Sequence, residues 1–303
     1  MIVMTSTQTR VSVLAVALIL FAAAALLLQA RPVSAQYNYD HVNVTATVNV
    51  TNAAPEILAQ YFDQNITLVA GSTKFVTCNA TIRDWNGYND LSNVNATMYY
   101  YLNSSGQADD ANEHYTNASC IETANDGQYL ANYSCGFDVQ YFANNGTWYC
   151  NMSVIDNSGF VASNETNTTI NALYALNVTD VIDYGNLSLL EYSDNITATV
   201  TNFGNSAINV SVLGYGATEG DGIGLVCNQG TNITVDNERF SGSLVDWTLK
   251  TPLSATNQDM NITLFQQQSD VTPVTYDTYW QLYVPPNPFG VCTGTVRFTA
   301  TTI

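Results

Sequence analysis

Gly146-Thr-Trp-Tyr-Cys-Asn-Met-Ser-Val-Ile-Asp-Asn-Ser-Gly159 is the stretch of sequence that decides the fold. Every second residue falls on one apolar face of an extended chain: Trp148, Cys150, Met152 and Val154. Polar residues occupy the other face, which is the alternation of a half-buried strand that ends in an Asp-Asn-Ser-Gly turn.

A second strand of the same kind is predicted at residues 74–82. Cys78 lies on its inward face, and Asn79 lies on its outward face. In the strand quoted above, within residues 146–159, Cys150 likewise points inward and Asn151 outward. Two strands that agree in this way predict the two sheets of a β-sandwich, joined by a Cys78–Cys150 bridge.

The six cysteines are an even number, which in an exported chain predicts disulfides, although many connectivities remain open. We expect three bridges: Cys78–Cys150, Cys120–Cys135 between neighbouring strands, and Cys227–Cys292 within a second domain. There is no Cys-x-x-Cys motif and no cluster of cysteine and histidine, so the sequence argues against a structural zinc site.

The N-terminus indicates export. Residues 11–30 are a continuous apolar run, and Val33-x-Ala35 fits the small-residue rule for signal-peptide cleavage. The run is also long enough to span a bilayer, so residues 1–35 are either a signal peptide or an uncleaved membrane anchor. Both alternatives place the remaining chain outside the cytoplasm, at the cell surface or beyond it. Only residues 11–30, if retained, would contact a membrane.

The composition excludes one class of partner. The net charge is −18, from 25 acidic and 7 basic residues, whereas nucleic-acid binding requires clustered Lys and Arg. The negative charge also disfavours binding to anionic lipid head groups.

Asn-x-Ser/Thr sequons recur along the whole chain. Dense N-glycosylation is one interpretation, and polar residues that merely suit β-strands are the alternative. The predicted glycosylation sites are Asn79, Asn95, Asn132, Asn151, Asn195, Asn209, Asn232 and Asn261.

Two domains are predicted after the leader, at residues 55–172 and 173–303. The strands expected in the first domain are 66–69, 74–82, 94–102, 128–137 and 148–155. Residues 36–54 precede both domains and contain an alternating run of valine and alanine from Val42 to Val50. This run is either an edge strand of the first sandwich or a donor strand inserted into the next subunit of a filament.

The cysteine in an early strand and the aromatic-x-Cys in a late strand resemble an immunoglobulin-like sandwich. Two features depart from that pattern: Trp148 replaces the usual tyrosine two residues before the second cysteine, and no tryptophan lies on a distinct third strand. Taken with the turn Asp84-Trp-Asn-Gly87, the segment Thr201-Asn-Phe-Gly-Asn205 and the closing strand, the chain resembles uncharacterised archaeal secreted or cell-envelope glycoproteins with tandem immunoglobulin-like domains. The resemblance implies an all-β fold of two tandem β-sandwiches, and it carries no catalytic residues with it.

The sequence contains no nucleophile elbow, metalloprotease motif or phosphate loop. Its two histidines, His41 and His114, are both expected at the surface, so we predict that the protein is not an enzyme. Calcium is the one cofactor that the sequence suggests. Asp84, Asn86 and Asp90 offer oxygen ligands around a tight turn, and a capped β-turn without a metal is the alternative.

These observations predict a non-enzymatic, extracellular structural or adhesive glycoprotein that contacts cell-surface proteins or glycans or assembles with itself. One alternative is a carbohydrate- or protein-binding module that uses exposed aromatic residues from Tyr99–Tyr101, or Trp280 and Tyr283. Another is a donor-strand filament subunit. A hydrolase that uses a pair of carboxylates is a third alternative, and no sequence motif supports it.

Overall fold

The computed structural model describes residues 44–268 and 272–303. The chain divides into two units, residues 1–50 and 51–303, and all described strands lie in the second unit. Among the described residues, no helix is long and apolar enough to cross a membrane. The predicted leader, residues 1–35, lies outside the described residues.

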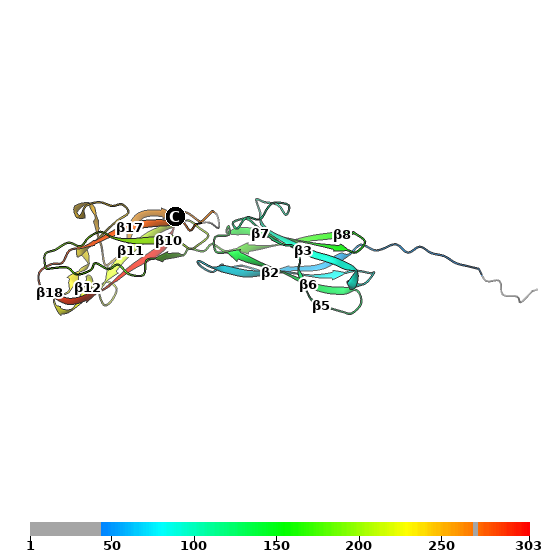
Figure 1. Cartoon of the computed structure of the whole chain (residues 1–303), viewed down its shortest axis with the longest axis horizontal. Coiled ribbons are helices and arrows are strands. Elements are labelled where there is room, and N and C mark those ends of the chain that lie inside the picture. The colour runs from blue at the N-terminus through cyan, green and yellow to red at the C-terminus, as the bar shows by residue number, and fades with distance from the viewer. Residues whose placement is uncertain (1–43, 269–271) are drawn as a thin grey trace, which may run out of the picture. The chain divides into compact units, whose positions relative to one another are not determined.

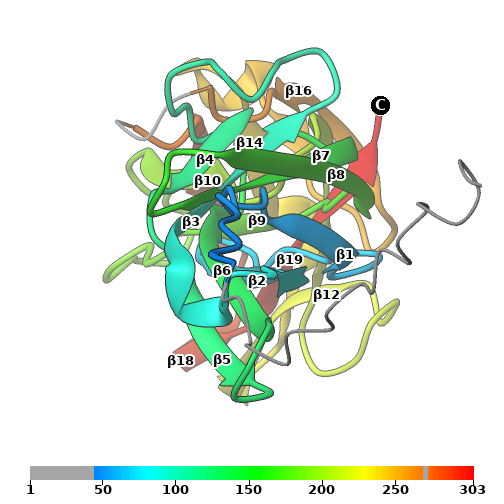
Figure 2. The same cartoon turned by 90° about the vertical axis from the view of Figure 1, so that its right-hand side faces the viewer.

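The first sandwich consists of two antiparallel sheets of four strands, which face each other in Figures 1 and 2. One sheet has the order β1-β2-β6-β5 and the other the order β4-β3-β7-β8. The strands are β1 (Glu56–Phe62), β2 (Thr73–Arg83), β3 (Leu91–Tyr100), β4 (His114–Asn117), β5 (Ile121–Asn125), β6 (Leu130–Gln140), β7 (Gly146–Asp156) and β8 (Val161–Ile170). A short 3₁₀ helix, Tyr88–Asp90, precedes β3.

This strand order is the immunoglobulin-like one, in which a disulfide joins the second strand to the last strand but one. Here Cys78 on β2 is bonded to Cys150 on β7, and both side chains are fully buried. The predicted all-β, immunoglobulin-like fold is therefore confirmed. The other two disulfides, Cys120–Cys135 and Cys227–Cys292, join the pairs expected from the sequence.

Trp148 stabilises the strand that precedes the second cysteine. Its side chain is fully buried, and its indole N–H donates to the backbone carbonyl of Asn144 at 2.7 Å. In immunoglobulin domains a tyrosine at this position bonds to backbone a few residues upstream. The tryptophan, which the sequence marked as a departure from the family pattern, thus makes the same kind of contact through its N–H.

We expect Trp148→Phe to lower the free energy of unfolding by about 2 kcal/mol, because it loses this hydrogen bond and leaves space in the core. Trp85→Phe is the matched control, since Trp85 is 54% exposed. Urea denaturation followed by circular dichroism measures both variants. Equal stability of the two would contradict a structural role for the Trp148 contact.

The second sandwich has a five-stranded sheet of order β15-β14-β17-β10-β9 and two three-stranded sheets of order β16-β11-β19 and β13-β12-β18. Its strands are β9 (Leu176–Val178), β10 (Ile196–Asn202), β11 (Ile208–Tyr215), β12 (Ile223–Gly230), β13 (Ile233–Thr234), β14 (Glu238–Ser241), β15 (Thr251–Pro252), β16 (Gln258–Leu264), β17 (Thr275–Leu282), β18 (Pro288–Thr293) and β19 (Thr295–Thr302). Two 3₁₀ helices, Val235–Asn237 and Trp247–Leu249, flank β14. A core separate from that of the first sandwich forms around Trp280 and Phe240.

Two predictions about strands were wrong. Residues 66–69 form no strand; Ile66 makes only an isolated bridge, although it and Leu68 are buried. Residues 44–54 also form no strand and pair with no sheet, so the edge-strand alternative for the N-terminal segment is wrong, while the donor-strand alternative stays a prediction. The proposed domain boundaries at residues 55–172 and 173–303 remain predictions.

Candidate functional site

The edge of strand β19 is open. β19 pairs with β11 along its whole length, and among the described residues no strand pairs with its other edge. In the first sandwich the corresponding strand, β7, is paired on both sides, with β3 and with β8. The inward residues of β7 are fully buried, whereas those of β19 (Val296, Phe298 and Ala300) are only half-buried. The second sandwich therefore leaves part of its core uncovered.

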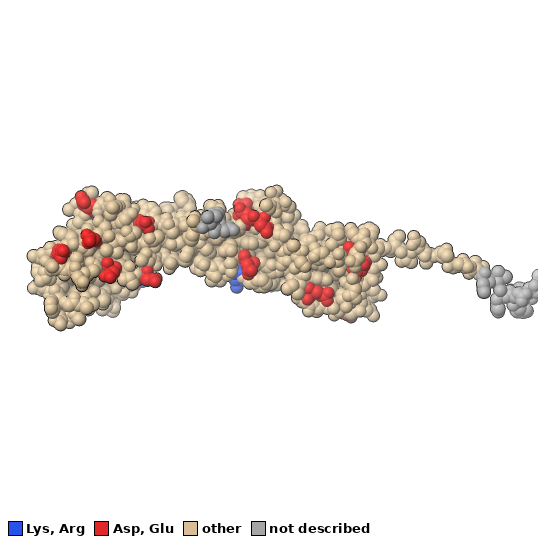
Figure 3. Space-filling model, in the orientation of Figure 1, with Lys and Arg blue, Asp and Glu red and all other residues tan. Residues whose placement is uncertain are grey.

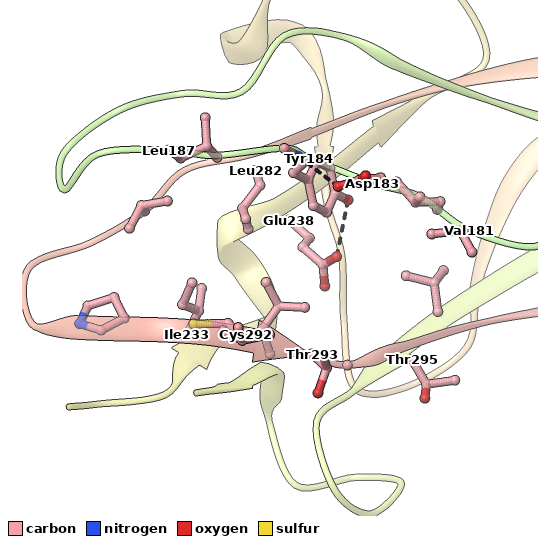
Figure 4. Close-up of a pocket in the computed structure, with 18 of the residues that line it drawn as sticks. Val181, Asp183, Tyr184, Leu187, Ile233, Glu238, Leu282, Cys292, Thr293 and Thr295 are labelled. Carbon is pink, nitrogen blue, oxygen red and sulfur yellow. Dashed lines mark hydrogen bonds between the residues drawn. The ribbon is translucent and has the colours of Figure 1, made fainter. Parts of the chain in front are cut away.

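A groove of about 1230 Å³ lies beside this edge, between residues 177–189 and residues 288–298. Figure 4 shows Val181, Tyr184 and Leu187 on one wall and Cys292, Thr293 and Thr295 on the other. Polar residues, including Asp180, Asp183 and Thr293, share the lining with aliphatic and aromatic ones: Val178, Ile182, Leu187, Leu225, Ile233, Leu282, Val284, Val296 and Phe298. The apolar members of this lining favour an occupant that has an apolar face.

Large apolar side chains also stand exposed around the groove. The exposed fractions are 67% for Val181, 53% for Leu189, 67% for Phe289 and 68% for Val291. Contiguous exposed apolar residues of this kind mark interaction surfaces in soluble proteins.

The first sandwich shows what occupies the equivalent place. There, the segment after β1 meets β8 through a parallel bridge between Ile66 and Ile170, and β8 continues along β7. Ile170 is 1% exposed and completes the core. In the second sandwich, the segment after β9 and the edge of β19 face each other across the groove without such a strand.

A single carboxyl group lies deep in the groove. Glu238 on β14 is 2% exposed, and the Tyr184 hydroxyl donates to its Oε1 at 3.1 Å. Burial raises the pKa of Glu238 to about 7, and the Tyr184 bond opposes this only in part. Burial and the nearby carboxyl also hold the pKa of Tyr184 well above its ordinary value. The groove thus holds one deeply buried carboxyl whose charged form burial disfavours, and Asp180 and Asp183 line it as well.

Apart from the buried Asp84, Asp156 and Glu238, the acidic residues that the structure describes are exposed or half-buried. Figure 3 shows them scattered over the face in view, with a single small basic area. This dispersion is consistent with a role in solubility.

A second surface feature is a group of aromatic residues on the second sandwich. Tyr192 lies 5.0 Å from Trp247 and 4.8 Å from Tyr283, measured between ring centroids. The Arg239 guanidinium covers the Trp247 ring at 4.6 Å. Tyr192 is 51% exposed, so the group is open to solvent on one side. Sequence reasoning found only Tyr283, because the other members come from distant segments.

The other aromatic residues predicted to bind a ligand differ in their exposure. Trp280 is fully buried in the core and Tyr99 is 8% exposed, so their prediction as exposed binding residues was wrong. Period-2 alternation places Trp280 on the inward face of β17, beside Thr278 and Leu282. Tyr101 is exposed, as expected.

The predicted calcium ligands are only partly brought together. Asp84 and Asp90 lie beside Asp156, with one carboxylate oxygen of each within 4.8 Å of the others. The Asn86 side-chain oxygen instead accepts from the Ala53 N–H at 2.8 Å. Repulsion from the two neighbouring carboxylates adds to burial in raising the pKa of Asp84. Calcium binding at Asp84, Asn86 and Asp90 remains a prediction, and Asp156 is the neighbour that sequence spacing could not reveal.

His114 is fully buried on β4, so its predicted surface position was wrong. Its Nδ1 lies 2.9 Å from Asp109 Oδ1, and pairing of β4 with β3 carries the ring inward. His41 lies outside the described residues.

None of the eight predicted glycosylation asparagines is buried. The most exposed are Asn132, Asn195, Asn232 and Asn261. Their modification remains a prediction that the exposure permits.

No protein-family model and no curated protein matches the chain. Among solved structures, a chain of the CsuC–CsuE chaperone–tip adhesion subunit complex from Acinetobacter baumannii aligns with 12% identity and a TM-score of 0.38, over 80% of this chain and 99% of that one. A carbohydrate-binding module of the β-sandwich superfamily aligns with 12% identity and a TM-score of 0.25, over 83% and 97%. Tandem immunoglobulin domains of titin align with 9% identity and a TM-score of 0.24, over 82% and 96%. Likenesses this weak carry no argument, so the fold assignment rests on strand order and the disulfide.

Proposed function

We propose that the protein is a non-enzymatic, extracellular structural or adhesive glycoprotein whose second sandwich binds an extended polypeptide strand. The open edge of β19, beside a groove lined in part by apolar side chains, carries this proposal. An extended peptide can add to such an edge through main-chain hydrogen bonds, while its alternate side chains enter the groove. Three disulfides support a location outside the reducing cytoplasm.

Binding of short synthetic peptides tests the proposal. Peptides that alternate valine and threonine should bind, raise the fluorescence anisotropy of a dye-labelled peptide, and slow hydrogen exchange in β19. In Val181→Asp/Val291→Asp, affinity should fall roughly tenfold or more, because charges then face the apolar strand. Both replaced residues are exposed, so folding should be unaffected.

Leu102→Asp/Ile121→Asp provides the matched control. These residues are 73% and 72% exposed and belong to the first sandwich, so the same chemical change there should leave affinity unaltered. Absence of peptide binding to the wild-type protein, or an equal loss in both variants, would rule out strand addition at the groove.

The aromatic group around Trp247 supports a second candidate function, glycan binding. Tyrosine and tryptophan rings present apolar faces and polar edges at a solvent-accessible site, next to the cationic Arg239. A glycan array should show binding that Trp247→Ala removes and that Tyr174→Ala, at a residue 45% exposed elsewhere, preserves. An array without signal would exclude this candidate.

A further inference from the structure

The segment before β1 has the pattern that the groove requires. Residues 44–50 alternate apolar and polar side chains, with Val44, Ala46, Val48 and Val50 on one face. Val44 and Val48 are each 84% exposed and Val50 is 80% exposed, and the segment belongs to no strand. A β-competent segment with an uncovered apolar face needs a partner surface.

The chemistry of the segment matches the groove. Residues 42–51 contain no charged side chain and have one apolar face, and the groove offers apolar side chains beside polar ones that include Asp180, Asp183 and Glu238. The sequon asparagines Asn43 and Asn49 alternate with the valines, so a strand with its valines in the groove would direct both outward. Sugars at these positions would therefore not obstruct binding.

The segment is too short to reach the groove of its own chain. β1 begins at Glu56, which pairs with Arg83 at one end of β2. The second sandwich is joined at the other end of β2, where the Gly71 N–H donates to the Phe203 carbonyl at 3.3 Å. β2 is ~33 Å long at the usual rise of a strand, whereas the chain between Val50 and Glu56 spans about 20 Å when fully extended.

We infer that the strand occupying the groove is residues 42–50 of a second copy of this chain. The inference rests on the proposed strand-binding function and names its partner. Inserted beside β19, the segment would supply to the second sandwich the strand that β8 supplies to the first. Each copy then carries a donor segment and a separate acceptor groove. Because these two surfaces differ, the contact is heterologous, and repeating it links copies into open chains instead of closed dimers.

Two neighbouring substitutions in the full-length exported protein test the inference. Val48→Asp places a charge on the apolar face of the donor segment and should weaken association roughly a hundredfold or more. Thr47→Asp introduces the same charge one residue away, on the opposite face, and should leave association unchanged. Residue 48 is exposed and outside every strand, so its substitution should not disturb folding. Mass photometry and negative-stain microscopy measure the distribution of assembly sizes.

A mixing experiment adds a positive readout. Val48→Asp retains an intact groove, and Val181→Asp/Val291→Asp retains an intact donor segment. Each variant alone should be monomeric, whereas an equimolar mixture should form one-to-one dimers and nothing longer. Such dimers support the inference, because two independently damaged chains complement each other only if the donor and the groove are the interacting surfaces.

The remaining outcomes separate this inference from the proposed function. Assembly of Val48→Asp at wild-type affinity, or equal loss in Thr47→Asp, overturns the inference. If the wild-type chain stays monomeric while alternating peptides bind its groove, the occupant comes from another protein: the inference falls and strand binding stands. If neither the chain nor any peptide occupies the groove, both are wrong.

Discussion

Replacing Cys78 and Cys150 together by alanine is expected to lower the free energy of unfolding of the first sandwich by roughly 4 kcal/mol. The bridge closes a loop with a sequence separation of 72 residues, and a loop of that length restricts the unfolded chain by about this amount. Both side chains are fully buried between the two sheets, so the loss of sulfur contacts adds to the effect. Chemical denaturation of the oxidised wild-type and variant proteins measures the difference.

Hydrogen exchange supplies the internal control for this variant. The amides of β2 and β7 should lose protection, whereas those of β10 and β17 should keep it, because their core is separate. A change below about 1 kcal/mol would show that sheet packing holds the sandwich without the covalent bridge.

Glu238→Gln is expected to make the protein more stable than wild type at alkaline pH and to remove a pH dependence. The folded-state pKa of Glu238 is about 7, against an ordinary value of 4.5. Between these values the unfolded state releases the proton while the folded state retains it, so stability falls as pH rises through this window. Above the folded pKa the deficit should reach roughly 3 kcal/mol, and the neutral amide avoids it.

Chemical denaturation of wild type and Glu238→Gln at about pH 5 and about pH 8 measures this effect. The quantity compared is the difference in free energy of unfolding between the two proteins at each pH. Asp194→Asn, at an exposed position of the same sandwich, is the control and should leave the wild-type profile in place. If wild type and Glu238→Gln showed parallel profiles, the carboxyl would have to be hydrated in the folded state.

The strands with regular apolar alternation could be predicted from the sequence, because burial on one face imposes a period of two. That parity located β2 and β7 and placed Cys78 opposite Cys150. It failed for β8, whose largely polar residues become a strand by pairing with β7. Residues 66–69 show the reverse failure, because Ile66 and Leu68 are buried without forming a strand, and Ile66 makes only an isolated bridge to Ile170 at the end of β8.

The groove shows a different limit of sequence reasoning. The inward direction of Val296, Phe298 and Ala300 follows from alternation and agrees with their packing against the core. Alternation says nothing about which strand is the neighbour, however, and the groove exists only because β19 has none on one side among the described residues. The predicted calcium site lacked Asp156 for the same reason. Asp156 lies far along the sequence, so local spacing could not show that it is beside Asp84 and Asp90.

The disulfides also set how far the protein could be stretched. Cys78–Cys150 and Cys227–Cys292 close loops with separations of 72 and 65 residues, and Cys120–Cys135 lies inside the first loop. A pulling force transmitted along the backbone would bypass both loops through the sulfur atoms, withholding about 250 Å and about 230 Å of extensible contour. The chain from Cys150 to Cys227, a separation of 77 residues, lies outside both loops, so a tether built from such molecules would lengthen mainly there, by about 270 Å per molecule when that segment is fully extended.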